Sequence, residues 1–449
     1  MAFVPQRDRG VSASLRSKFE LAVRRSLRIG IAAVSASLCG LLAAPSIAQT
    51  GDGISAPPSA ETPAIDMGTT AEAPLRVTLT QELSYKLQEP DHIVKNRSSV
   101  QLEYSKYFSD NYFAQFNGKA TDFLPKDHRH GPEGTDVTVS RAYLQTSFGQ
   151  TSLKAGIQVL PWGESLVSPI TDEVSPRDNR ELFNFNLEEL RLGQPMVVAE
   201  HYSGVGRWGV FWIPKASFNK NPVKGTEYNF DPFTYAPGTE GHGGSEFGAS
   251  WRKNFDNADI TLMAASLLDN DYALRMNANN TVSRVKNRFT MAGAVFTYAY
   301  KDFVFRGEAA FKSRKAYDDA AFQIVKRNAF DASAGFDYRW SSSLTFGVEA
   351  VNQHIAGWSS DIQTFPRDRQ TILLSLTKLL MNDDLSINVL HFSNTPYRSR
   401  LTMLVTSLKW NDHLTFGLNV VYPSTSDARS DLWPVRDQKQ IALKVQYQF

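Results

Sequence analysis

The chain has 449 residues and only one cysteine, Cys39, so it forms no intramolecular disulfide. After residue 48 it has no apolar run of about 18 residues, which excludes membrane-spanning helices from the rest of the chain. Its 48 basic and 46 acidic residues nearly cancel, and without a basic excess we expect no nucleic-acid partner. If this chain enters a membrane, it does so as strands.

The first 48 residues have the three parts of a secretory signal peptide. A basic flank over 16–28 is followed by an apolar run over 29–44 and by Ser46-Ile47-Ala48, which has the small-x-small form of a cleavage site. Cys39 lies inside the apolar run and follows a leucine, whereas a lipid-modified cysteine follows a small residue, so we expect no lipidation. Removal of residues 1–48 leaves 48 − 7 = 41 basic and 46 − 2 = 44 acidic residues, a formal charge of −3.

Residues 49–74 are rich in proline, alanine, threonine and serine and show no hydrophobic period. Such a segment cannot bury enough apolar area to fold, and we interpret it as a disordered periplasmic tail. From residue 75 onward, short segments alternate apolar and polar residues, as in 75–87 and 440–449. We count about eighteen, with sixteen as the alternative. The pattern predicts an all-β fold: a transmembrane up-and-down antiparallel β-barrel over residues 75–449.

Short and long links alternate between these segments. Short links such as Gly149-Gln150 and Lys301-Asp302 alternate with long ones along the chain. The long links are predicted near 88–96, 122–135, 161–194, 215–245, 269–287, 313–327, 354–367, 393–397 and 423–437. This asymmetry is typical of outer-membrane barrels, which have tight periplasmic turns and longer outer loops. Both ends of the barrel then lie on the periplasmic side, which requires an even number of strands.

Aromatic residues stand beside the short links and at the end of the chain. They predict an interfacial girdle at the periplasmic level, formed by Phe108, Tyr112, Phe148, Trp208, Phe255, Tyr300, Phe303, Trp340, Trp410 and Phe449. The last segment stops on Phe449, with Tyr447 on the same face. This ending resembles the C-terminal signature of Gram-negative outer-membrane proteins. The resemblance implies an outer-membrane location, contact with its lipid, and recognition of Tyr447 and Phe449 by the barrel-assembly machinery.

The polar faces of the segments carry charges of both signs. Burying them in a dry core would cost several kcal/mol per unpaired ion, so we predict a water-filled lumen. The candidates that line it are Glu103, Arg141, Lys154, Arg252, Arg306, Glu308, Asp337 and Arg339. Their mixed signs indicate no clear ion preference. A narrow barrel packed with ion pairs is the alternative, but about eighteen strands are enough to leave a channel.

The link over 161–194 is the richest in charged and aromatic residues. A loop of this length is rarely without function. Folded into the pore, its charges would form a constriction, as charged rings do in selective channels. The constriction candidates are Glu164, Asp172, Glu173, Arg177, Asp178, Arg180 and Glu181. The alternative is a surface lid held by its own salt bridges.

Three short motifs surround and enter this link: Gly156-Ile157-Gln158, Trp162-Gly163-Glu164 and Pro176-Arg177-Asp178. They resemble the G-x-Q, W-G-E and P-R-D run of a poorly characterised family of proteobacterial outer-membrane barrels, known mainly as a domain of unknown function. The resemblance covers residues 153–200 and implies an outer-membrane barrel, without implying a substrate.

The sequence predicts no catalytic, metal or cofactor site. His391 and Ser393 share one face of a strand but lack a third catalytic partner. His128 and His130 lack a cysteine or a spaced carboxylate, and Asp269-Asn270-Asp271 lacks the glycine and distal glutamate of a calcium loop. We therefore expect no enzyme, no metal and no cofactor.

These observations predict a porin-like channel for passive diffusion of small hydrophilic solutes, either a monomer or a homo-oligomer. The apolar stretch at 182–187 keeps an alternative open. In that alternative the barrel is closed or plugged and serves as a structural or adhesive surface protein, or it transports hydrophobic substrates.

Overall fold

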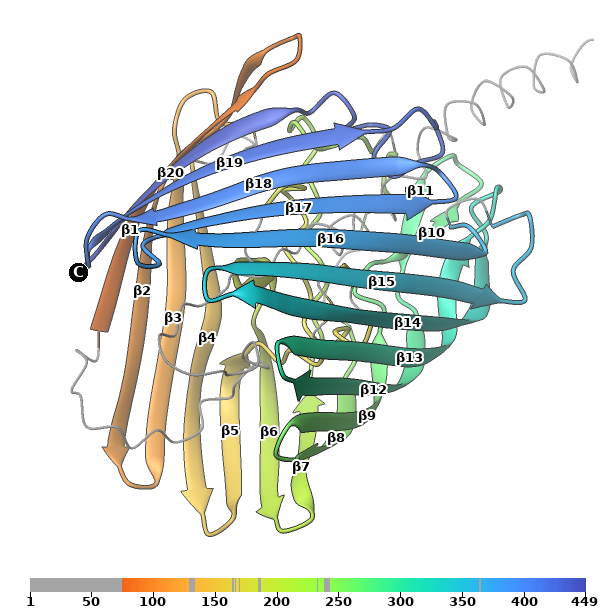
Figure 1. The fold of residues 1–449 in the computed structure, drawn as a ribbon. Coiled ribbons are helices and arrows are strands. Elements are labelled where there is room, and N and C mark those ends of the chain that lie inside the picture. The colour runs from red at the N-terminus through yellow and green to blue at the C-terminus, as the bar shows by residue number, and fades with distance from the viewer. Residues whose placement is uncertain are drawn as a thin grey trace, which may run out of the picture.

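The computed structural model describes residues 75–449, except 129–133, 164, 166, 169, 185–186, 232, 238–242 and 363–364. The predicted signal peptide and tail lie outside the described residues. Eighteen of the described strands form one closed antiparallel sheet (Figure 1), and a separate hairpin, β10 (Ala273–Met276) with β11 (Val282–Val285), belongs to an outer loop. The predicted barrel and its strand number are confirmed.

The ring runs in sequence order, since each strand pairs with its neighbours along the chain and β9 pairs with β12. Its strands are β1 (Leu75–Lys86), β2 (His92–Ser109), β3 (Tyr112–Phe123), β4 (Thr135–Phe148), β5 (Thr151–Gln158), β6 (Gln194–Ser203), β7 (Gly206–Ile213), β8 (Glu246–Asn254), β9 (Ala258–Leu268), β12 (Arg288–Tyr300), β13 (Phe303–Asp318), β14 (Ile324–Ser341), β15 (Leu344–Ala356), β16 (Asp368–Leu380), β17 (Leu385–Thr395), β18 (Ser399–Lys409), β19 (Leu414–Ser424) and β20 (Gln440–Gln448). In the described part of the chain the one helix is α3 (Leu187–Leu190), and no helix is long and apolar enough to span a membrane.

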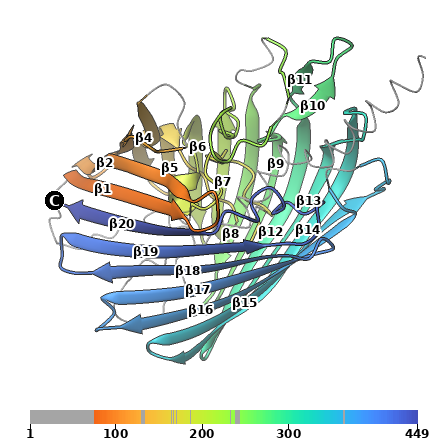
Figure 2. The same cartoon turned by 90° about the horizontal axis from the view of Figure 1, so that it is seen from above.

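The last strand closes the ring against the first. β20 pairs with β1 from Thr78↔Gln448 to Lys86↔Gln440, and the backbone N–H of Phe449 donates to the carbonyl of Val77 at 2.9 Å. Figure 2 shows β2, β1, β20 and β19 side by side at this seam. A closed ring has no unpaired edge, which is the condition for strands to cross a hydrocarbon layer.

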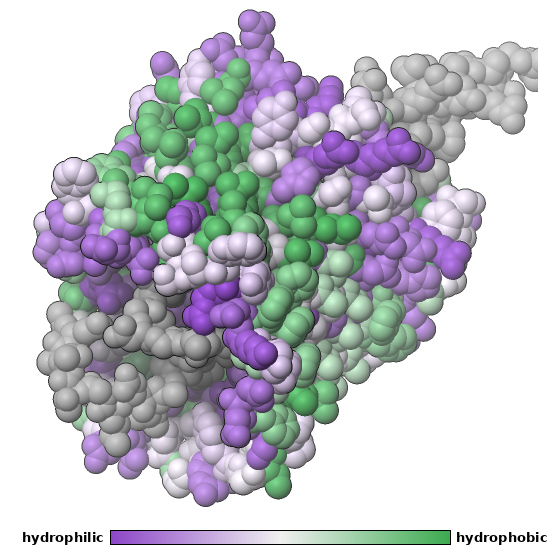
Figure 3. Space-filling model, viewed as in Figure 1, coloured by the Kyte–Doolittle hydropathy of each residue, from purple (hydrophilic) through white to green (hydrophobic). Residues whose placement is uncertain are grey.

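The alternation of side chains gives the barrel an apolar outer face. On β16, Ile372 and Leu374 are each 48% exposed, while Leu373 between them is 2% exposed and points inward. Figure 3 shows apolar residues spread across the outside of the strands and hydrophilic residues gathered toward their ends. A continuous apolar surface of this kind is stable against lipid and not against water.

The aromatic residues predicted beside the short links lie on the outer surface. Phe108, Trp340 and Trp410 are exposed at the ends of their strands next to short turns, and Phe449 is exposed at the seam. The short turns range from two residues, as at 149–150, to four, as at 381–384. This end of the barrel is therefore the periplasmic one, and the opposite end carries the loops.

Three outer links are shorter than the sequence predicts. The links expected near 88–96, 313–327 and 393–397 contain only residues 87–91, 319–323 and 396–398, because the flanking strands continue beyond the membrane. β2 and β14 have 18 residues each, whereas about 9–11 suffice to cross a bilayer. Outside the lipid neither face of a strand needs to be apolar, so the apolar-polar alternation does not reveal these strand extensions. In β13 a bulge after Lys312 also shifts which residues face inward.

The inner face differs in part from the water-filled lumen, lined by charges of both signs, that the sequence predicts. Toward the loop end, inward side chains such as Leu373, Phe392 and Leu401 are buried, and they lie opposite one another on β16, β17 and β18. They belong to one apolar cluster with Leu432 and Val435 of the 425–439 loop. Three loops contribute buried side chains to this cluster: 159–193, 425–439 and the β7–β8 link, which supplies Ala216 and Tyr228. The cluster fills part of the outer half of the barrel.

Candidate functional site

The loop 159–193, between β5 and β6, lies inside the barrel. Apolar side chains bury its middle: Val167 and Ile170 have no exposed surface, and Leu182 and Phe183 are 3% exposed. Trp162 packs edge-on against Phe211 of β7, with ring centroids 5.1 Å apart. The loop is therefore packed against the inner wall, and the surface-lid alternative does not describe it.

One part of this loop is attached to β13 and β15. Glu308 of β13 accepts hydrogen bonds from the backbone N–H of Thr171 at 2.6 Å and from its hydroxyl at 2.5 Å. The hydroxyl of Ser165 donates to Glu349 of β15 at 2.6 Å. Lys312 of β13 binds Glu173 at 2.6 Å. These contacts hold residues 165–173 against one wall.

Glu173 also receives a second cation, since Lys315 lies 3.4 Å from its other oxygen. Burial alone would raise the pKa of Glu173, but Lys312 and Lys315 outweigh it and bring the pKa to about 2. The carboxylate is therefore ionised throughout the neutral range.

A later part of the loop is attached to β2, β3, β4 and β20. Glu181 binds Lys95 of β2 at 2.5 Å and also contacts Arg97 of the same strand. Arg180 binds Asp136 of β4 at 2.7 Å. The helix α3 contributes Glu189, which binds Lys119 of β3 at 3.0 Å and Lys444 of β20 at 3.6 Å, completing this group of contacts.

These two sets of contacts lie on opposite sides of the barrel. Counting round the ring from β1, β2 is the second strand and β13 the eleventh, so they are 11 − 2 = 9 positions apart in a ring of 18. A loop bound to both walls must cross the lumen.

Asp172 holds the crossing segment together at its middle. Its Oδ2 accepts from Arg177 Nη2 at 2.8 Å and from Arg191 Nη2 at 2.9 Å, and its Oδ1 accepts from the backbone N–H of Trp162 at 3.3 Å. Burial would raise the pKa of Asp172, but Arg191 and Arg177 lower it overall. We call Asp172, Arg177 and Arg191 the central cluster.

Two cavities with charged residues in their lining lie on either side of the central cluster. The larger, of about 350 Å³, is on the periplasmic side and is lined by Arg191, Lys119 and His413 among others. The smaller, of about 190 Å³, is on the loop side, where Asp172, Arg177 and Asp271 are part of its lining. Burial raises the pKa of Asp271 to about 6 although Asn221 and Asn219 donate hydrogen bonds to it.

The structure brings the constriction candidates into one loop inside the lumen, with Glu164 outside the described residues. Asp172 and Arg177 form the central cluster, and Glu173, Arg180 and Glu181 bind the wall. Asp178 pairs with Arg180 at 2.6 Å. Each of the described candidates is thus already paired with protein charge, and none is a bare charge in an open pore.

The lumen candidates lie on inward strand positions, and most of them are also paired. Lys154 binds Glu200 at 3.2 Å, Arg306 binds Asp337 at 2.9 Å, Arg252 lies 3.4 Å from Asp259, and Arg339 lies 3.7 Å from Asp302. Glu103 accepts a hydrogen bond from Asn117 at 2.8 Å and lines the larger cavity with Arg141. Glu308 differs from the rest, because the loop covers it.

Sequence reasoning missed several partners of the loop. Lys95 and Arg97 stand an even number of residues from Glu103, and Lys312 stands an even number from Glu308, so their side chains also point inward. If the predicted strands had been extended to the true ends of β2 and β13, these residues would have been candidates. Arg191 lies within the 161–194 link but was not among the candidates. The inward fold of the 425–439 loop has no such signal in the sequence.

The weaker sequence candidates have other partners. The imidazole Nδ1 of His391 contacts the hydroxyl of Thr402 at 2.9 Å, and His391 lies opposite Leu374, on the outer face. In the loop between β9 and β10, Asp269 pairs with Lys315, and Asp271 accepts hydrogen bonds from two asparagines. His130 lies outside the described residues.

Part of the chain is similar to a known protein family. Residues 73–202, which include the crossing loop, match the family model described as "Protein of unknown function (DUF1302)". No curated protein matches the chain.

Similar solved structures include OccAB2 of Acinetobacter baumannii, with 10% identity, a TM-score of 0.52 and coverage of 84% of this chain and 97% of that one. The outer membrane protein OpdK of Pseudomonas aeruginosa has 12% identity, a TM-score of 0.51 and coverage of 84% and 98%. A structure of OpdK with vanillate has 12% identity, a TM-score of 0.50 and the same coverage. From its closed ring, its apolar outer belt and these matches, the chain is a porin-like 18-stranded barrel of the outer membrane, and its residues 73–202 match the DUF1302 model.

Proposed function

We propose that this barrel is a narrow channel for passive diffusion of small hydrophilic solutes and that the loop 159–193 forms its constriction. The observation that carries the proposal is the crossing of the lumen, with the loop bound to β2 on one side and to β13 on the other. Cavities of about 350 and 190 Å³, each with charged residues in its lining, remain on either side of the central cluster. A solute would pass between them beside Asp172, Arg177 and Arg191, without a covalent step or an energy input.

The charges of the cavities favour cations. The larger cavity is lined by seven acidic and four basic residues, an excess of 7 − 4 = 3 acids. The smaller is lined by six acidic and three basic residues, again 6 − 3 = 3. Since charged linings select ions by sign, we infer a preference for cationic or neutral solutes. OpdK was solved with vanillate, a carboxylate, but at 12% identity that likeness supports the fold and not the solute.

Planar-bilayer recording tests the channel and its selectivity. We expect stable single-channel steps, and a reversal potential in a KCl gradient that indicates K⁺ preferred over Cl⁻. A preference for Cl⁻ would contradict the inference from the cavity charges. Absence of steps from the folded barrel would remove the open-channel proposal altogether.

Arg191→Ala tests the constriction. The change shortens a side chain between the two cavities, while Arg177 still balances Asp172, so the loop should keep its place and conductance should rise. Arg429→Ala is the matched control, because it removes an Arg–Asp pair that is exposed in the 425–439 loop. If both variants conduct like the wild type, the loop does not limit the flow.

One observation favours a second function. Apolar inner side chains on β15–β19 join Leu182 and Phe183 in a continuous cluster, as a plugged barrel or a transporter of hydrophobic substrates would require. That candidate becomes the better one if the folded barrel gives no ionic conductance.

A further inference from the structure

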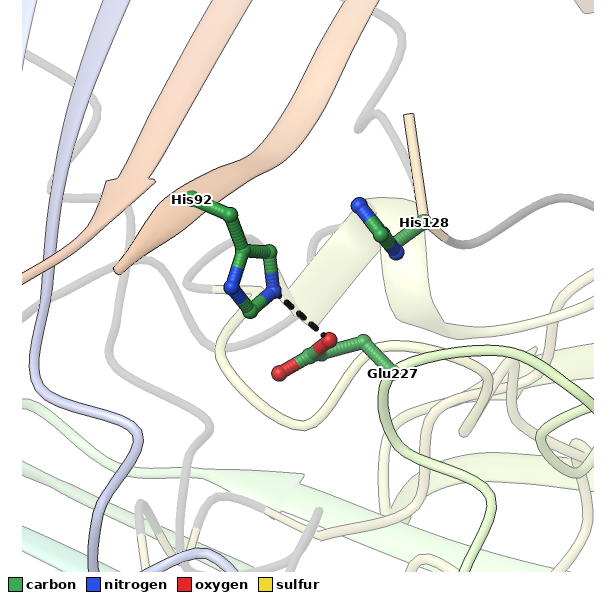
Figure 4. A group of neighbouring side chains, drawn as sticks. All are labelled: His92, His128 and Glu227. Carbon is green, nitrogen blue, oxygen red and sulfur yellow. Dashed lines mark hydrogen bonds and ion pairs between the residues drawn. The ribbon is translucent and has the colours of Figure 1, made fainter. Parts of the chain in front are cut away.

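Three side chains from separate segments meet at the loop end of the barrel, away from the central cluster. His92 is the first residue of β2, His128 lies in the β3–β4 link, and Glu227 lies in the β7–β8 link. One nitrogen or oxygen from each lies within 4.8 Å of the other two. Figure 4 shows the two imidazoles and the carboxylate turned toward one another.

Both ring nitrogens of His92 face oxygens that accept hydrogen bonds, so a neutral imidazole can donate to only one of them. Its Nδ1 lies 2.8 Å from the carbonyl oxygen of Pro90, and its Nε2 lies 2.9 Å from Oε2 of Glu227. Both oxygens accept and neither donates, whereas a neutral imidazole has a single N–H. If Nδ1–H donates to Pro90, the lone pair of Nε2 faces a carboxylate, and a cation between them would stabilise the pair.

This arrangement is the usual one for a histidine that binds a metal. Such a histidine donates its other N–H to a carbonyl or carboxylate, which sets the tautomer and the orientation of the ring. Pro90 serves this purpose for His92. On Glu227, Oε1 accepts from Gln438 and lies 3.9 Å from Lys86, so only Oε2 is directed at His92.

His128 completes the set. Its ring centroid lies 4.7 Å from that of His92, its side chain is exposed, and within the described part of the chain its ring accepts or donates no hydrogen bond. The backbone places it: His128 N–H donates to Val94 at 2.9 Å, and Glu227 N–H donates to the His128 carbonyl at 3.0 Å.

We propose that His92, His128 and Glu227 bind one divalent transition-metal ion of the zinc class, with water as a further ligand on the exposed side. Imidazole favours zinc, copper and nickel over calcium and magnesium. Zinc ligands at about 2.0–2.1 Å lie about 3.3 Å apart. His92 Nε2 and Glu227 Oε2, now 2.9 Å apart, must therefore separate slightly, and the donor of His128, within 4.8 Å of both, must approach by on the order of 1 Å. The ion would tie together the strand start at His92 and the two loops.

The site is linked to the constriction through the residue after Glu227. Tyr228 is 4% exposed and packs edge-on against Phe183 of the crossing loop, with centroids 5.8 Å apart. Metal binding would therefore stiffen the outer mouth directly above the crossing loop. The binding proposal itself does not depend on the channel function.

Calorimetric titration of the folded, chelator-treated full chain in detergent with ZnCl₂ tests the proposal. We expect one Zn²⁺ per barrel and no comparable binding of Ca²⁺. His92→Ala and Glu227→Gln should each weaken zinc binding by at least about tenfold. His128→Ala should do the same, and since its ring makes no described hydrogen bond, this variant should fold even if the others fail.

His354→Ala is the matched control, because His354 also pairs with a carboxylate, Asp368 at 2.7 Å, but has no third ligand among the residues that the structure describes. It should bind zinc like the wild type. The proposal is overturned if the wild type binds no Zn²⁺, as a plain His92–Glu227 ion pair would require, or if His128→Ala and Glu227→Gln leave the affinity unchanged.

Discussion

At the scale of single residues, the crossing loop and the wall fit closely where the wall has no side chain. Gly293 of β12 faces inward, and a Cβ built on it would lie 2.6 Å from Cγ2 of Thr171. Thr171 cannot turn away, because its hydroxyl donates to Glu308 at 2.5 Å. Glycine is therefore needed here for close approach, not for an unusual backbone conformation.

We expect Gly293→Ala to destabilise the barrel by about 1–3 kcal/mol, the usual cost of overpacking. Gly307→Ala is the control, since the nearest atom to its added Cβ would be 3.6 Å away. Denaturant unfolding of both variants in detergent measures the difference. Equal free energies of unfolding would show that Thr171 yields without cost.

At the scale of elements, the loop 159–193 keeps its position through ion pairs that resist acid. The folded-state pKa of Glu173 is about 2, below its ordinary 4.5. A depressed carboxyl pKa stabilises the folded state above the unfolded pKa, and this contribution is lost as the pH falls from 4.5 toward 2.

Conductance should therefore stay constant from pH 7 to about pH 4.5 as far as Glu173 is concerned, and it should rise as the pH approaches 2 and the loop is released. Glu173→Gln leaves Lys312 and Lys315 without this partner, so it should release the loop already at pH 7. Single-channel recording of the wild type and Glu173→Gln between pH 7 and pH 2 measures these changes in conductance. A rise centred on pH 4.5 or above in the wild type would contradict the role of Glu173.

At the scale of the whole molecule, the outer belt makes stability depend on depth in the bilayer. Leu374 lies in the middle of β16 and faces outward, whereas Leu380 faces outward at its periplasmic end. We expect Leu374→Arg to cost about 2–4 kcal/mol in lipid vesicles and Leu380→Arg about 0–1 kcal/mol. Denaturant unfolding in vesicles measures both. Similar costs at both positions would mean that the membrane does not lie where the belt indicates.

The same scale explains what sequence reasoning predicted and what it missed. Alternation marked the strands, since lipid on one side imposes a period of two wherever a strand crosses it. It failed for the ends of β2, β13 and β14, which lie beyond the lipid. It also predicted a polar lumen and missed inward residues such as Phe392, because only the packing of loops against these residues makes an apolar inner face stable. The roles of Tyr447 and Phe449 in assembly stay predictions.

The sequence by itself determined the barrel: an even number of about eighteen strands, its closure on Phe449, its lipid-facing belt and the charged loop 161–194 follow from local patterns. Only the tertiary structure decided what that loop does with its charges. Lys95 and Lys312 are far apart in the chain, and ring closure alone sets them on opposite walls, where one loop reaches both. For the same reason no spacing rule could bring His92, His128 and Glu227 together, since the contacts between a strand end and two outer loops depend on the order of strands around a closed ring.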